Sequence, residues 1–168
     1  MVTSPRILIA FAALLAAAMI LATGALAVLA PGGWRPDLFV LAFIPVALLA
    51  PDRWALAAGF ATGMAKDAAS GGRFGPMALC FTVAAFALAR LRRVLGADSP
   101  ITHVVFGILG VWLTEGALLL AGTLNEEAWP GSAAFGRLLG SSLITGLLAP
   151  LWMLVVDRVG RSARRKHR

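Results

Sequence analysis

The sequence has one cysteine, two histidines and no tyrosine, so it lacks most of the side chains that build disulfides and transition-metal sites. Cys80 lies inside an apolar stretch, and one cysteine excludes a disulfide framework and a cysteine-based metal site within one chain. The motifs His-Glu-x-x-His, Gly-x-Ser-x-Gly and Gly-x-x-x-x-Gly-Lys-Ser/Thr are also missing. We therefore expect no enzyme, no cofactor and no metal site.

Charge is scarce as well. Charged residues make up 14% of the chain and hydrophobic residues 60%, against about 25% and about 45 to 50% in soluble domains. A core formed by 168 residues in water is too small to bury that much apolar surface. The formal charge of +7 does not indicate a nucleic-acid binder, because the basic residues stand between and after apolar runs. The composition predicts an integral membrane protein with no soluble domain.

Six apolar segments are predicted to span the membrane as helices, which need roughly 20 apolar residues each. The second and third are short, and Pro45 should kink the second, so we expect this pair to be tilted, broken or partly covered by neighbours. The expected fold is an all-α bundle of about six transmembrane helices followed by a basic tail. The predicted spans are 7–30, 38–50, 54–65, 76–89, 101–122 and 135–156, and the tail is 157–168.

Lys and Arg residues predict the orientation. Six spans place both termini on one side, and cytoplasmic termini put eleven of the fifteen basic residues inside and four outside. The outside set is Arg35, Lys66, Arg73 and Arg137. The inside set is Arg6, Arg53, Arg90, Arg92, Arg93, Arg158, Arg161, Arg164, Arg165, Lys166 and Arg168. This bias predicts a multi-pass protein of the cytoplasmic (inner) membrane with N and C termini in the cytoplasm.

Two terminal segments have alternative interpretations. Arg6, the apolar run after it and the small residues of 25–27 also resemble a cleaved signal peptide, although the run is longer than a signal-peptide core of about 7 to 15 residues. The tail from Arg161 to Arg168 is expected to attract anionic lipid headgroups. A binding site for a cytoplasmic protein is the alternative for this tail.

Ionisable residues inside apolar segments are costly and therefore informative. Glu115 lies about seven residues, or roughly 10 Å, from the end of the fifth segment. It is either a buried partner for Lys66 or for another subunit, or a side chain that reaches the interface. His103, at the start of that segment, is expected to be an ordinary helix-end histidine rather than a proton carrier.

Glycine spacing predicts close helix contacts. Gly59, Gly63 and Asp67 are four residues apart and share one helix face, which favours packing within the chain over a subunit interface. The same interpretation applies to Gly136 and Gly140. The segment 70–76 is glycine-rich, and because it lacks the Lys-Ser/Thr of a phosphate loop it predicts a tight turn. Its last residue, Pro76, can open the next helix without an amide donor.

The middle of the chain resembles the MreD family, the rod shape-determining membrane proteins of bacteria. The resemblance is most specific between Arg35 and Gly75, and a later stretch, 146–152, resembles the end of that family and runs into Asp157 and Arg158. The residues that carry it are Arg35, Pro36, Asp37, Gly59, Phe60, Gly63, Asp67, Ser70, Gly71, Phe74, Gly75, Gly146 and Pro150.

The resemblance implies a non-enzymatic subunit of the machinery that elongates the peptidoglycan wall. In that family the protein works with MreC, with the filament protein MreB, with the glycosyltransferase RodA and with a class B penicillin-binding transpeptidase. A small bundle rich in glycine and alanine is suited to packing against other spans.

Two other functions compete with this one. Six short spans with glycine-rich turns also resemble the substrate-binding subunits of energy-coupling-factor vitamin transporters, which would need a pocket with convergent polar groups. The candidates for such a pocket are Lys66, Asp67, Glu115 and Asn125. An enzyme acting on lipid-linked precursors would need several carboxylates or histidines near one interface, and the chain offers little beyond Asp37, Asp67 and Glu115.

Overall fold

The computed structural model describes residues 15–17, 20, 34–71, 74–96, 99–124 and 131–165, without the side chains of 121–124 and 159–165. Most of the predicted first span, Asn125, the Glu126–Glu127 pair and the last three residues of the tail lie outside this part. Within it the chain is helical, as predicted. The elements are α3 (Leu38–Leu49), α4 (Asp52–Ser70), α5 (Pro76–Leu95), α6 (Pro100–Val111), the π-helical turn η1 (Trp112–Gly116), α7 (Ala117–Leu124) and α8 (Gly131–Arg165).

Several helices extend beyond the predicted apolar segments. The segment predicted at 54–65 is part of α4, which continues through Lys66 and Asp67 to Ser70. Helix α5 continues past Arg90 to Leu95, and α8 includes the start of the predicted tail, up to Arg165. Charged residues end an apolar window, but they do not end a helix when their side chains find partners or solvent.

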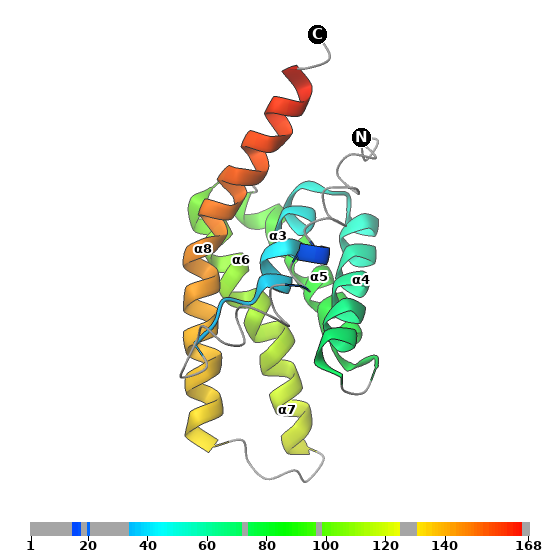
Figure 1. Cartoon of the computed structure of the whole chain (residues 1–168), viewed down its shortest axis with the longest axis vertical. Coiled ribbons are helices and arrows are strands. Elements are labelled where there is room, and N and C mark those ends of the chain that lie inside the picture. Colours follow the sequence, from blue (N-terminus) through cyan, green and yellow to red (C-terminus); the bar gives the residue numbers. More distant parts are fainter. Residues whose placement is uncertain are drawn as a thin grey trace.

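Helix α3 forms the centre of the fold. It has 12 residues and is apolar on every side, so it must be covered all round. Helices α4, α5, α6 and α8 all contact it (Figure 1), and its residues from Phe39 to Leu48 are buried. Pro45 lies inside this helix, and the chain leaves it at Pro51 before α4 begins.

Glycines bring two pairs of helices into backbone contact. At Gly59 an added Cβ would lie 2.7 Å from the carbonyl oxygen of Phe81, and at Gly63 it would lie 2.4 Å from the Cα of Ala78. These two glycines therefore let α4 pack closely against α5. An added Cβ at Gly107 in α6 would lie 2.7 Å from the Cα of Gly146 in α8. The predicted packing within the chain is thus confirmed for Gly59 and Gly63.

The other two predicted contact glycines behave differently. At Gly140 an added Cβ would lie 2.7 Å from the ring of Trp34, so this position also packs within the chain. At Gly136 an added Cβ would have no neighbour within 4 Å among the residues that the structure describes, so the predicted close contact is wrong within that part of the chain.

In the described part of the chain, two helices are long enough and apolar enough to cross a membrane. They are Pro100–Leu120, which combines α6, η1 and part of α7, and Gly131–Arg158 of α8. Helix α3 is apolar but shorter. Large apolar side chains are exposed on several helices, among them Leu79 of α5 and Leu147 of α8, which are 67% and 68% exposed.

The helix contacts predict opposite effects for two glycine substitutions. Gly63→Ala should lower the free energy of unfolding by about 1 to 3 kcal/mol, because the methyl group overlaps the backbone of α5. Gly136→Ala should be neutral or stabilising, because its methyl group would touch none of the described residues and alanine favours the helix. Unfolding of both variants in detergent, followed by tryptophan fluorescence, checks this. Equal stability of the two variants would contradict the packing.

Candidate functional site

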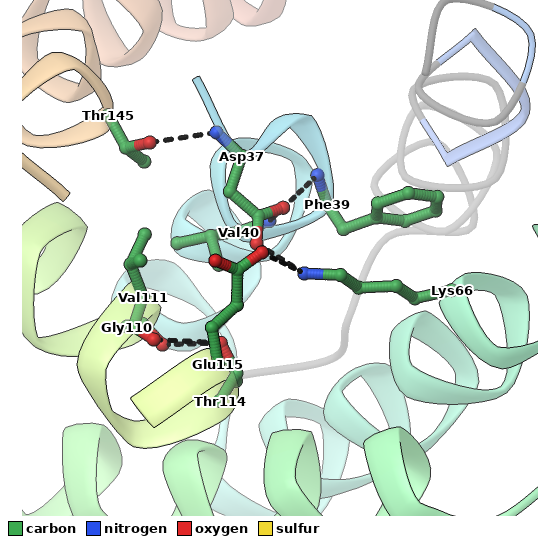
Figure 2. Close-up of polar contacts among 9 residues, drawn as sticks. All are labelled: Asp37, Phe39, Val40, Lys66, Gly110, Val111, Thr114, Glu115 and Thr145. Atoms are coloured by element: carbon green, nitrogen blue, oxygen red, sulfur yellow. Dashed lines mark hydrogen bonds and ion pairs between the residues drawn. The ribbon is translucent and has the colours of Figure 1, made fainter. Parts of the chain in front are cut away.

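The side chain of Lys66 in α4 joins two carboxylates from other parts of the chain (Figure 2). Its Nζ lies 2.5 Å from Oδ2 of Asp37 and 3.1 Å from Oε1 of Glu115. The side chains of Lys66 and Asp37 are only 14% and 3% exposed, whereas Glu115 is 35% exposed. The ammonium also lies 5.9 Å and 5.6 Å from the ring centres of Phe39 and Phe81, at distances typical of cation–π contacts. Of the two alternatives for Glu115, the pairing with Lys66 is present.

Asp37 holds the start of α3 in addition to binding Lys66. Its Oδ1 accepts hydrogen bonds from the amides of Phe39 and Val40, at 3.0 and 3.2 Å, and so caps the helix. Its own amide donates to Oγ1 of Thr145 in α8, at 2.8 Å (Figure 2). Through Asp37, therefore, polar contacts connect α3 with both α4 and α8.

A π-helical turn presents Glu115. Turn η1 interrupts the helix between α6 and α7, and such wide turns often occur at functional sites. Inside it, the hydroxyl of Thr114 donates to the carbonyl oxygen of Gly110 at 2.8 Å, so part of the altered backbone is satisfied locally. Glu115 is thereby directed toward Asp37 and Lys66 (Figure 2).

A cavity of about 460 Å³ lies beside this cluster. It is bordered by the chain before α3 and by residues of α3, α4, α5, η1, α7 and α8. Its polar lining residues are Arg35, Asp37, Lys66, Glu115, Arg137 and Ser141. Its apolar lining residues are Pro36, Leu38, Phe39, Met77, Leu118, Leu119, Ala134 and Leu138. Three cations and two carboxylates thus converge on one cavity.

Asp67 has a separate, structural environment. It is 2% exposed, and its carboxylate accepts hydrogen bonds from the amides of Gly75, Met77 and Ala78 at 2.9 to 3.2 Å. These amides belong to the turn and to the first residues of α5, where helix amides have no partner within the helix. Gly71 and Gly75 have φ values of 64° and 115°, which confirms the glycine turn. Asp67 therefore closes the α4–α5 connection and does not face the cavity.

Arg92 forms a third cluster, at the other end of α3. Its guanidinium donates to the carbonyl oxygens of Ala47, Leu48 and Ala50 and pairs with Asp52, which Arg93 also binds. Desolvation raises the pKa of the Asp52 carboxyl, but the charges and hydrogen bonds of Arg93 and Arg92 outweigh it and hold the pKa below its ordinary value. This contribution to stability is therefore complete above about pH 4 and is lost only at more acidic pH.

The residues singled out in the sequence fall into two groups. Arg35, Pro36, Asp37 and Glu115 gather at the cavity, together with Lys66. The others belong to the framework: Gly59, Gly63, Asp67 and Gly75 join α4 to α5, Gly146 joins α6 to α8, and Pro150 lies inside α8.

Three residues that line or contact the site are not predicted as site residues from the sequence. Thr145, Ser141 and Arg137 of α8 stand four residues apart, and this spacing was the available signal that they share a helix face. Nothing in the sequence indicates that Arg92 reaches back to α3.

Comparison of the chain with protein-family models, with curated proteins and with solved structures gave no match.

The Lys66 cluster predicts a large and non-additive effect on stability. Lys66→Met leaves two carboxylates without their counter-ion and should cost about 3 to 5 kcal/mol of unfolding free energy. Glu115→Gln should cost about 1 kcal/mol, because this carboxylate is partly exposed. The double variant should lose less than the sum of the two, as measured by denaturant titration in mixed micelles. Additive losses would show that the two side chains do not interact.

Substitution of Asp67 should also lower the free energy of unfolding. Asn at position 67 keeps one acceptor oxygen and turns an amide group toward backbone donors, so Asp67→Asn should cost about 2 to 3 kcal/mol. Asp52→Asn removes an equal charge from a more exposed position and should cost clearly less than Asp67→Asn. The same titration compares the two variants, and a larger loss for Asp52→Asn would contradict this assignment.

Proposed function

We propose that this chain is a non-enzymatic scaffold subunit of the bacterial cell-wall elongation (rod) complex, of the MreD type, which binds MreC and helps to organise the peptidoglycan synthases. In this proposal it is a multi-pass protein of the inner membrane with cytoplasmic termini and about six spans. The eleven-to-four bias of basic residues supports that orientation. In the proposed orientation, Arg35, Lys66 and Arg137 lie in the extracytoplasmic half.

The observation that carries the proposal is a row of exposed apolar side chains along α8. Every fourth residue contributes: Phe135, Leu139, Leu143, Leu147, Leu151 and Val155 are between 39% and 68% exposed. Side chains at this spacing form one of the ridges with which helices pack into grooves of other helices. A spanning helix of a partner can therefore dock along the length of α8.

The buried polar groups also support a scaffold role. Asp37, Lys66 and Asp67 bind to other groups of the same chain and stabilise its fold. The residues of the MreD resemblance divide between this polar framework and the glycine contacts. Such a molecule has a large contact surface and little reactive chemistry, which suits a scaffold.

A paired set of variants tests the docking row. Leu143→Ala with Leu147→Ala should reduce the amount of MreC recovered with the tagged chain in mild detergent by about fivefold to tenfold, equivalent to about 1 to 1.4 kcal/mol. The control, Leu79→Ala with Val83→Ala, removes exposed apolar side chains from α5 and should leave recovery unchanged. Both variants should accumulate normally in the membrane.

Depletion of the chain from a rod-shaped bacterium that has no second copy should produce spherical cells and release MreC from the complex. Normal rods without the chain would overturn the proposed function. Recovery of MreC that is equal for the α8 variant and the α5 control would overturn the docking row.

The cavity favours a second candidate function, a small-molecule-binding subunit of a vitamin transporter. Its volume of about 460 Å³ falls within the range of ligand sites, about 300 to 1,000 Å³, and its polar groups converge. Purification with a water-soluble molecule bound to the cavity, lost in Lys66→Met, would favour this function over the scaffold.

A further inference from the structure

We propose that the cavity beside Lys66 binds an anionic, phosphate-bearing amphiphile, with the phosphate held between Arg35 and Arg137 and the hydrocarbon part against Leu118, Leu119 and Leu138. This site goes beyond the scaffold role and does not depend on MreC. It requires only that the described helices stand in a lipid bilayer.

The two arginines stand within about one turn of each other along α8. The ring of Trp34 packs on Gly140, and the amide of Asp37 binds Thr145, so residues 34–37 run alongside α8 in the same direction. Figure 1 shows this extended segment reaching α8 before it turns into α3. Arg35 therefore lies near the turn that carries Ser141, and Arg137 lies one turn earlier on the same face.

The two arginines favour an anion over a neutral or cationic ligand in this cavity. Lys66 is already shared by Asp37 and Glu115, whereas Arg35 and Arg137 are exposed and form no ion pair with any residue that the structure describes. Two planar guanidinium groups match the oxygens of a phosphate. The carboxylate of Glu115, which also lines the cavity, repels an anion, so the phosphate would bind at the arginines instead.

The remaining lining selects an apolar tail. Leu118 and Leu119 from α7, Leu138 from α8, and Phe39 and Met77 all line the cavity with apolar side chains. A cavity of this size holds a headgroup and the first part of a chain, and the rest of a lipid would remain in the bilayer. The extended backbone at 34–37 fits this arrangement, because non-helical segments at membrane depth occur where they are buried in protein or line a cavity.

Three probes distinguish the parts of the ligand. Dioleoyl phosphatidylglycerol carries both phosphate and tails, dioleoylglycerol lacks the phosphate, and glycerol 3-phosphate lacks the tails. Titration of the purified full-length chain in detergent, followed by native mass spectrometry, should show one phosphatidylglycerol bound at least tenfold more tightly than either of the other probes. Equal affinity for glycerol 3-phosphate or for dioleoylglycerol would overturn the proposal.

Two arginine pairs provide the matched variants. Arg35→Gln with Arg137→Gln should weaken phosphatidylglycerol binding by tenfold or more. Arg53→Gln with Arg90→Gln removes the same charge from exposed positions elsewhere and should change binding by less than twofold. Equal binding by the two double variants would overturn the assignment.

A third variant keeps the test decisive if the first pair fails to fold. Glu115→Gln removes the repelling carboxylate and should leave phosphatidylglycerol binding as tight or up to a fewfold tighter. Weaker binding by a folded Glu115→Gln variant would instead show that the ligand needs this carboxylate and would overturn the anion site.

Discussion

One ammonium group shared by two carboxylates in apolar surroundings holds the described helices in their arrangement. Lys66 approaches Asp37 and Glu115 close to two phenyl rings, and Asp37 in turn caps α3 and binds Thr145 of α8. Removal of charge from water is costly, so these groups are stable only when all of them are present and correctly placed. That requirement fixes α3, α4, η1 and α8 relative to one another.

The short central helix follows from the same constraint. Helix α3 starts at the cluster through Asp37 and ends where Arg92 binds its last carbonyl groups, so charged side chains satisfy both ends of an otherwise apolar element. Because α3 begins there, α7 and the first turns of α8 continue beyond it (Figure 1). The cavity lies in the space that these helices border, and its lining combines the charged cluster with leucine side chains.

The sequence predicts the helical class, the approximate position of each described helix and the glycine turn, because these depend on local composition. It also offers the contact between Glu115 and Lys66 as one of two alternatives. The sequence predicts that α4 and α5 end too early, because the hydropathy pattern treats Lys66 and Arg90 as boundaries. That pattern contains no information about the partners of these side chains. Asp37 and Arg92 act through residues 29 to 108 positions away in sequence, a distance that local patterns do not report.

The most direct test of this account is the geometry of Lys66 in a bilayer. The chain has two lysines, Lys66 and Lys166, so labelling of lysine with ¹⁵N and of aspartate and glutamate with ¹³C gives a simple solid-state NMR spectrum, assigned with Lys166→Arg. We expect the carboxyl carbons of both Asp37 and Glu115 within about 4 Å of the Lys66 nitrogen. A Lys66 nitrogen with neither carbon in that range would contradict it.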